Sequence, residues 1–161
     1  MQQHPTEPPV KPWRGTHLGD WLRLALDRFE QRVLIHMAHH PGLPLGLSNL
    51  AARGQVGAAH IHITRHLPLE GARLNDLARA AGMRKQSMGA LVTQCESWGM
   101  VRRVPDGTDA RARRIEYTAI GLSWLQAYHD AVEAAQAEMQ ASTSAEVATV
   151  IALGLEAYCN F

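Results

Sequence analysis

The sequence predicts a mainly α-helical fold with one small antiparallel β-sheet. Apolar residues recur at helical spacing before residue 67 and after residue 118. Between them, two helical patterns are separated by Gly82, and two short strand-like segments flank a loop that begins with Asp106-Gly107. Helix, sharp turn, helix and hairpin, in this order, are the layout of a winged helix-turn-helix.

The N-terminal part of the chain predicts an arm followed by helices. Residues 1–19 hold four of the eight prolines and no apolar h-region, which indicates a flexible arm and not a secretory signal. Asp20 is expected to cap a helix that runs to about His40. A short helical turn around 48–53 and a helix over about 56–66 follow. The apolar stripe of the first helix is Leu22, Leu26, Phe29, Val33 and Met37.

The helix-turn-helix pattern begins at Asn75, which is expected to cap a helix over 76–81. Gly82 ends that helix because a residue free to adopt positive φ is needed there. A second helix begins at Lys85 and ends at Gly99; its buried stripe is Met88, Leu91, Val92 and Cys95, and its opposite face is small and polar.

The hairpin and the C-terminal helices complete the predicted fold. The strands are expected over 100–104 and 114–118, with residues 71–74 as a third strand. Thr118 then caps a long helix, and Thr143-Ser144-Ala145-Glu146 is a capping-box pattern for a last helix ending near Cys159. The apolar side of the long helix is expected to carry Leu122, Leu125, Val132 and Met139.

About 50 residues resemble the DNA-binding domain of the MarR family of transcriptional regulators. The motifs that carry the resemblance are Leu77-Ala78, Gly82-Met83, Lys85-Gln86-Ser87-Met88-Gly89, Leu91-Val92, Gly99-Met100-Val101, Asp109-Ala110-Arg111-Ala112-Arg113, and Thr118 with Gly121. Two departures are Met83-Arg84, where the family often has a Ser or Thr cap, and Tyr117, where an aliphatic residue is usual. The flanking regions match in helix layout only.

This resemblance implies a DNA-binding homodimer that acts most often as a repressor and is released from its operator by a small molecule. It divides the chain into a flexible arm (1–19), an N-terminal dimerisation region (20–55), a winged helix-turn-helix domain (56–121) and C-terminal dimerisation helices (122–161). Two-fold symmetry would let two recognition helices reach successive turns of one DNA face.

Site residues follow from the second helix and the wing. Base reading is expected from Lys85, Gln86, Ser87 and Ala90, because Gln pairs with adenine and Lys reaches guanine. The resemblance implies that Asp109 steadies Arg111 and that Arg111 enters the minor groove. Arg102 and Arg103 alternate along a strand, so one faces DNA and the other solvent. The expected phosphate contacts are Arg84, Thr93, Arg102 and Arg113.

Charge is segregated along the chain. Residues 84–114 contain seven Lys or Arg and three Asp or Glu, whereas residues 115–161 contain six acidic residues and no Lys or Arg. The positive segment coincides with the helix-turn-helix, as expected for a phosphate-binding surface. A solvated basic loop is the alternative when charge is considered alone.

Other features limit the function classes. No apolar run reaches the 18 residues needed to cross a membrane, and two cysteines fit a reducing cytoplasm. No phosphate loop, nucleophile motif or carboxylate pair indicates an enzyme, and no cofactor is expected. A winged-helix interaction module that does not read sequence remains an alternative; such modules usually carry an apolar or acidic surface in place of a polar recognition helix.

Nine histidines include two helical i, i+4 pairs, His36 with His40 and His62 with His66. Such pairs can hold zinc, which leaves a metal-responsive regulator of the same fold as an alternative, although no Glu of a metalloprotease motif and no ligating Cys accompanies them. The main expectation, which the resemblance to the MarR family implies, is a crevice for a small aromatic acid between the dimer helices and the winged domain. Its candidate residues are His36, His40, His62, Arg65, His66, Trp124 and Tyr128.

Overall fold

A computed structural model describes residues 17–53, 55, 58–109 and 111–160, with the backbone alone at 58, 59, 61 and 62. Most of the predicted arm therefore lies outside the described residues. The elements are α1 (Leu18–Ala38), α2 (Leu45–Ala52), α3 (Ala58–His66), β1 (Ala72–Arg73), α4 (Leu74–Ala80), α5 (Lys85–Ser97), β2 (Val101–Pro105), β3 (Arg113–Tyr117), α6 (Ala119–Thr143) and α7 (Ala145–Cys159).

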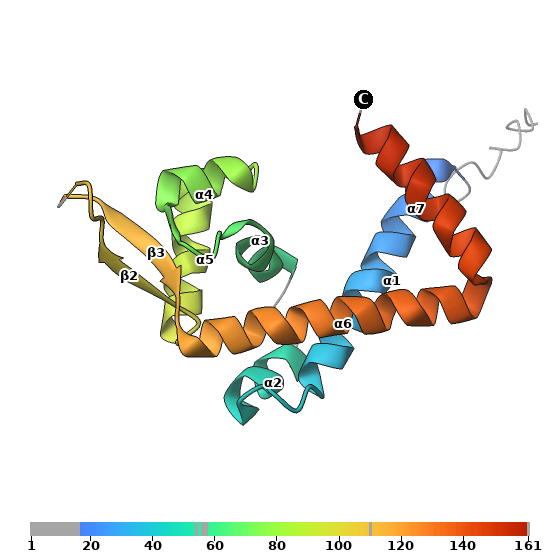
Figure 1. Cartoon of the computed structure of the whole chain (residues 1–161), viewed down its shortest axis with the longest axis horizontal. Helices are drawn as coiled ribbons and strands as arrows, with labels where there is room; N and C mark the ends of the chain where they lie inside the picture. Colours follow the sequence, from blue (N-terminus) through green and yellow to red (C-terminus); the bar gives the residue numbers. More distant parts are fainter. Residues whose placement is uncertain (1–16, 54, 56–57, 110, 161) are drawn as a thin grey trace, which may run out of the picture.

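The long helix α6 connects two parts of the molecule (Figure 1). The sheet, α4 and α5 lie at its N-terminal end, and α1 and α7 lie at its C-terminal end, so the molecule is shaped like a V. Helix α1 packs against both α6 and α2. No helix in the described ranges has both the length and the apolar character that crossing a membrane requires.

The helix-turn-helix and the three-stranded sheet confirm the predicted fold class. Gly82 and Gly99 have φ values of 62° and 74°, as expected for residues that end helices. The strand order is β1-β3-β2 and both pairings are antiparallel, with Ala72 opposite Ile115 and Arg103 opposite Ile115 on its other side. The predicted strands are each correct to within one or two residues.

The apolar stripe predicted for α6 is wrong. Leu122 is exposed and Leu125, Val132 and Met139 are only partly buried. The helix instead buries Gly121, Trp124, Ala127, Ala131 and Ala135. Small side chains let α1 approach α6 closely, and this contact selects the face that is buried. In α1 the predicted stripe is buried only at Val33 and Met37, near its C-terminal end.

Three predicted helix caps are also wrong. Helix α1 begins at Leu18, and a ring nitrogen of His17 accepts the N–H of Asp20, which lies in the first turn. Helix α4 follows β1 directly, so Asn75 is inside the helix and Arg73 precedes it. Helix α7 is capped one residue later than expected, by Ser144, whose hydroxyl accepts the N–H of Val147 at 3.2 Å. The predicted cap of α6 by Thr118 is confirmed.

Candidate nucleic-acid interface

Helix α5 has one buried face and one exposed polar face. Met88, Val92 and Cys95 are fully buried in the core and fix the orientation of the helix. The four predicted base-reading side chains are therefore all exposed together on the outer side: Lys85, Gln86, Ser87 and Ala90. A small polar helix face with no bulky side chain can approach base edges in a major groove.

The N-terminus of α5 is open. The residue before the helix, Arg84, has extended backbone angles, and its side chain makes no capping hydrogen bond. The first-turn N–H groups of α5 therefore point outward with the positive end of the helix dipole. Such a terminus attracts an anion such as a phosphate.

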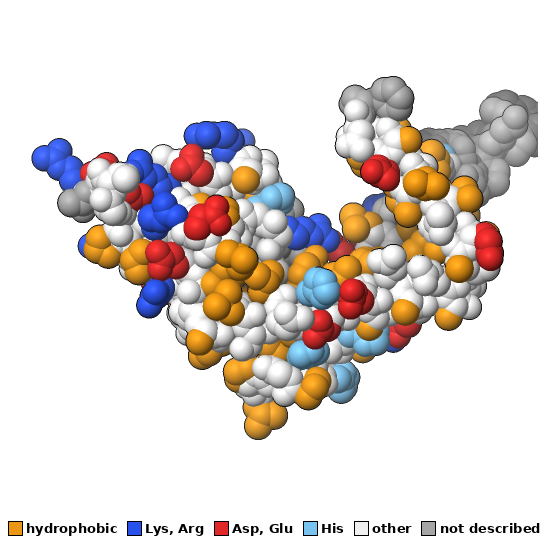
Figure 2. Space-filling model, viewed as in Figure 1, with side chains coloured by type: hydrophobic (Ala, Val, Ile, Leu, Met, Phe, Trp, Pro, Cys, Tyr) orange, Lys and Arg blue, Asp and Glu red, His pale blue; other side chains and the backbone are white. Residues whose placement is uncertain are grey.

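A groove of about 460 Å³ lies between the start of α4, the start of α5 and the sheet. Its wall carries the cations of Arg73, Lys85, Arg103 and Arg113 and the single carboxylate of Asp109. A concave surface with this excess of positive charge focuses a positive potential that attracts a polyanion such as nucleic acid. In Figure 2 the Lys and Arg side chains gather on this arm of the V.

The base of the wing is held by an ion pair that the sequence did not predict. The Asp106 carboxylate is almost fully buried and accepts from Arg73 Nε at 2.8 Å and from the Thr108 N–H at 2.9 Å. These hydrogen bonds, led by that of Arg73, lower the pKa of Asp106 below its usual range. Asp106-Gly107 indicated only a turn, and no local pattern could identify a partner 33 positions earlier.

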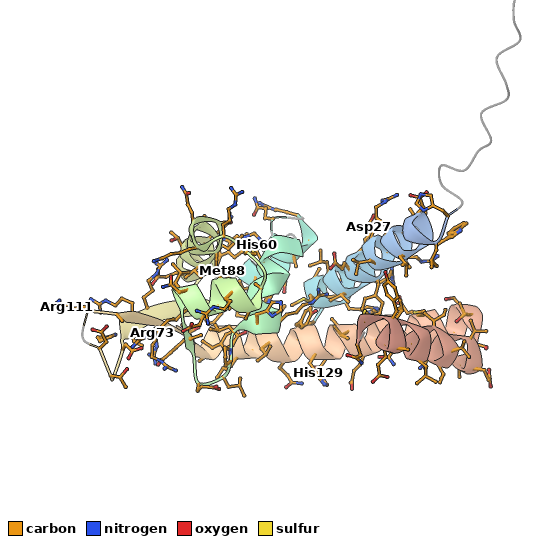
Figure 3. The ribbon with its side chains drawn as sticks, turned by 90° about the horizontal axis from the view of Figure 1, so that it is seen from above. Asp27, His60, Arg73, Met88, Arg111 and His129 are labelled. Atoms are coloured by element: carbon orange, nitrogen blue, oxygen red, sulfur yellow. The ribbon has the colours of Figure 1, made fainter. Side chains whose placement is uncertain are left out.

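At the wing tip, Asp109 acts on the backbone of Arg111 and not on its guanidinium. The Asp109 carboxylate accepts the Arg111 N–H at 3.0 Å, and its carbonyl accepts the Ala112 N–H at 2.9 Å. This local turn leaves the Arg111 side chain at the far end of the wing, pointing away from the protein (Figure 3). Among the described residues, no acidic side chain forms an ion pair with Lys85, Arg111 or Arg113.

The strand residues Arg102 and Arg103 lie on opposite faces of the sheet. Arg103 contacts α5, where it forms an ion pair with Glu96 and donates to the Thr93 hydroxyl at 2.9 Å. Arg102 is 62% exposed and pairs with Glu116 at 3.2 Å. Because Arg103 lines the groove and Arg102 does not, the geometry favours Arg103 over the predicted Arg102 as the groove cation.

Three of the seven residues predicted for an effector crevice, His36, His40 and Trp124, have contacts elsewhere in the fold. His36 and His40 contact carboxylates of α6, Glu138 and Asp130, each at 3.0 Å. Trp124 is a core residue, 1% exposed, whose Nε1 donates to the Thr64 hydroxyl. These three side chains are engaged in contacts that pack α1 and α3 against α6.

Two of the seven, Arg65 and Tyr128, contact each other. Arg65 Nε donates to the Tyr128 hydroxyl at 3.0 Å, and Arg65 Nη2 lies 3.5 Å from Glu30 Oε1. These residues come from α3, α6 and α1, the three helices that meet where the winged domain adjoins the terminal helices. His66 is half-buried at the end of α3, and the side chain of His62 is outside the described part of the structure.

Comparison with known proteins shows which proteins the chain resembles. Residues 61–112 match the model of the MarR family. The fold resembles S. aureus MepR (16% identity, TM-score 0.64, covering 89% of this chain and 97% of that one). It also resembles wild-type MarR from E. coli (15% identity, TM-score 0.63, covering 88% of this chain and 96% of that one). A MarR-family transcription regulator described as SP03579 is also similar (20% identity, TM-score 0.62, covering 91% of this chain and 93% of that one).

A search of curated proteins finds no match. One MepR mutant of the same fold was solved bound to an oligodeoxyribonucleotide (15% identity, TM-score 0.57). The family match covers the helix-turn-helix and the first part of the wing, and the shared fold extends over about nine-tenths of the chain. Residues 61–112 are therefore similar to the MarR family, and they lie within a winged helix-turn-helix fold that the chain shares with solved structures of MarR-family regulators.

Proposed function

We propose that this protein is a sequence-specific regulator that binds double-stranded DNA as a homodimer on a pseudo-palindromic operator. The observation that carries the proposal is the exposed polar face of α5 beside a cationic groove and an arginine-tipped wing. Residues 56–121 form the DNA-binding domain in this proposal, and residues 20–55 and 122–161 supply the dimer contacts. Repression, as is common in the family, is the proposed sign of regulation.

In the proposed complex, Gln86 reads adenine, Lys85 reads guanine, and Ser87 and Ala90 contact neighbouring base edges. The side chain of Gln can pair with adenine through two hydrogen bonds, and Ala offers apolar contact to a thymine methyl group. Exposure of all four side chains on one face of α5 supports this assignment.

Phosphates are held by the edges of the same surface. Arg84 and the open N-terminus of α5 contact one strand, and Arg103, Arg113 and the Thr93 hydroxyl contact the backbone along the groove. Arg111 enters the adjacent minor groove, where a narrow A·T-rich segment attracts a guanidinium. The position of Arg111 at the wing tip supports this role (Figure 3).

The proposed dimer uses the exposed apolar surface of α1 and α7. Large apolar side chains that would be costly to leave in water lie along both helices: Leu18, Trp21, Leu26, Val150, Leu153 and Tyr158. A groove of about 500 Å³ between α1 and α6, lined by Trp21, Leu24 and Phe29, continues this surface. An isologous partner that buries these side chains would place two recognition helices on one face of DNA.

We place the proposed binding site of a small molecule that releases the protein from DNA at the contact of Arg65 with Tyr128 and Glu30. An aromatic carboxylate that replaced Glu30 on Arg65 and stacked near Tyr128 would alter how α3 packs on α1 and α6. Release requires that the ligand binds more tightly to the form that cannot bind DNA. Arg65→Ala should then remove release by benzoate-type acids in a gel-shift titration, and Arg53→Ala, an exposed change elsewhere, should retain it.

The central test is selection of binding sites from random duplex DNA with the purified full-length protein. A two-fold symmetric sequence is expected to emerge, and affinity should fall steeply with salt in proportion to the phosphates contacted. Gln86→Ala should relax the preference at one or two positions per half-site, at about 1–3 kcal/mol each. Arg113→Ala should weaken all sequences equally. Recovery of no consensus would support the non-sequence-reading interaction module instead.

A second test concerns the wing. Arg111→Ala is expected to weaken operator binding by roughly 1–3 kcal/mol. The side chain is fully outside the core, so the thermal unfolding curve of the variant should match that of the wild type. Equal operator affinity of the two proteins would remove the wing from the proposed interface.

A further inference from the structure

Three side chains on the middle of α6 present metal-binding atoms to one point. His129, Asp130 and Glu133 each offer one ligand atom, and these atoms lie within 4.8 Å of one another. On a helix, positions four or three residues apart share a face, which brings Glu133 beside both His129 and Asp130; His129 and Glu133 are exposed and Asp130 is half-buried. Figure 3 shows His129 on the outer side of α6, and Figure 2 shows histidine and acidic side chains gathered over this part of the helix.

A fourth residue, from a distant part of the sequence, holds the central carboxylate in place. His40 follows α1, and its Nε2 lies 3.0 Å from Asp130 Oδ2. Gln126 Nε2 donates to Asp130 Oδ1 at 2.8 Å. An oriented, ionised carboxylate is what a metal ligand requires, and such supporting contacts orient ligands in known metal sites.

The spacing and the donor types fit a particular class of metal. His129 Nε2 lies 3.9 Å from Glu133 Oε1, and His129 Nδ1 lies 3.4 Å from Asp130 Oδ1. One ion can bind only one nitrogen of His129, and with one ligand atom from each residue the three atoms lie within 4.8 Å of one another. Two ligands of a tetrahedral zinc ion are roughly 3.4 Å apart, so side-chain rotations would bring the three atoms to that spacing. One imidazole and two carboxylates suit Zn²⁺ and similar ions, whereas Mg²⁺ prefers oxygen ligands alone.

We propose that His129, Asp130 and Glu133 bind a divalent transition metal of the zinc class, with His40 positioning Asp130. The site differs from the two histidine pairs that the sequence suggested, because His36 contacts Glu138 instead. The two carboxylates neutralise the charge of the ion, and water completes its coordination. Through His40 the bound metal would strengthen the contact between the end of α1 and the middle of α6.

The proposal is tested by calorimetric titration of ZnCl₂ into the metal-stripped full-length protein. One equivalent is expected to bind, and His129→Ala and Glu133→Gln are each expected to weaken binding by roughly tenfold or more. His40→Ala should weaken it about tenfold through the loss of orientation. His39→Ala is the matched control: His39 is an exposed neighbour whose Nδ1 bonds to the carbonyl of Ile35, and this variant should bind zinc normally.

Three outcomes would overturn the proposal. These are the absence of zinc binding to the wild type, unchanged binding by both His129→Ala and Glu133→Gln, and an equal loss in His39→Ala. MgCl₂ should compete weakly; equal affinity for Mg²⁺ would overturn the role of the imidazole. Circular dichroism of each variant checks the fold, and Glu133→Gln, an isosteric change at an exposed side chain, keeps the test decisive if another variant unfolds. DNA binding plays no part in this measurement.

Discussion

Gly121 lies in the first turn of α6, directly against the start of β2. The Thr118 hydroxyl accepts the Gly121 N–H at 3.1 Å, and the Thr118 N–H donates to the carbonyl of Met100 at 3.1 Å. A Cβ atom on Gly121 would lie 1.9 Å from that same carbonyl oxygen. Glycine is therefore required here by close approach of two backbones, and this contact sets the direction in which α6 leaves the winged domain.

Gly121→Ala is expected to destabilise the protein by about 1–3 kcal/mol or more, because the backbone carbonyl has to move. Gly46→Ala is the matched control, since no atom lies within 4 Å of its added Cβ. That helical substitution should leave stability unchanged or raise it by up to about 1 kcal/mol. Urea unfolding of both variants makes the comparison, and coincident midpoints would contradict the close approach.

Cys95 faces the core from α5 and is fully buried, whereas Cys159 is exposed. Burial raises the pKa of the Cys95 thiol to about 12, so almost none of it is thiolate at neutral pH. A thiol reagent should therefore modify only Cys159 in the native protein and both cysteines after unfolding. Rapid modification of Cys95 in the native state, detected by peptide mass spectrometry, would contradict this prediction.

At the scale of elements, the α1–α6 contact is reinforced by charged groups. Arg32 donates to both carboxylate oxygens of Glu138, at 2.6 and 2.7 Å, and His36 Nε2 lies 3.0 Å from the same carboxylate. The two-point geometry is the favourable form of an Arg–carboxylate pair. Both partners are partly exposed, so screening by solvent limits the energy of the pair.

This pair predicts an acid-dependent loss of stability. Hydrogen bonds from Arg32, and secondarily from His36, lower the pKa of Glu138 from 4.5 to about 2. A depressed carboxyl pKa means that the native state binds fewer protons, so its stabilisation is complete above about pH 4.5 and is lost as pH falls towards 2. Wild type should exceed Glu138→Gln in urea stability at pH 6, and the difference should narrow below pH 4.5. A difference that stays constant with pH would contradict the assignment.

At the scale of the whole molecule, the arms of the V have different surfaces. The winged arm carries the cations of Lys85, Arg111 and Arg113, and the arm formed by α1 and α7 carries exposed apolar side chains (Figure 2). Single apolar residues on a surface are ordinary, but a continuous set along two helices is typical of an interface. The surfaces proposed for DNA binding and for self-association therefore lie towards opposite ends of α6.

Leu153→Glu should disrupt the proposed dimer, because a charge would be buried at the contact. Leu153 is 59% exposed on α7, and Leu69, 70% exposed on the segment before β1, provides the matched control. Light scattering should show a monomer for Leu153→Glu and a dimer for Leu69→Glu, and operator affinity should fall only in the former. A stable Leu153→Glu dimer would exclude α7 from the interface.

The sequence by itself determined the local structure of the winged helix-turn-helix. Gly82, Gly99 and Thr118 end or begin helices through backbone angles and hydrogen bonds that span only a few residues, so their residue types are sufficient signals. The polar outer face of α5 was likewise predictable, because helical periodicity assigns residues to faces before any partner is known.

Only the tertiary structure decided which side chains meet across the fold. The pairing of Arg73 with Asp106, the choice of Arg103 over Arg102 for the groove, and the separation of His36 from the Arg65–Tyr128 contact depend on how helices and strands pack. The residues around His129 lie on one helix and could have been recognised from their spacing, whereas the contact of His40 with Asp130 depends on how α1 packs on α6. Local patterns specify elements, but contacts between distant residues are selected by the shape and volume of the packed core.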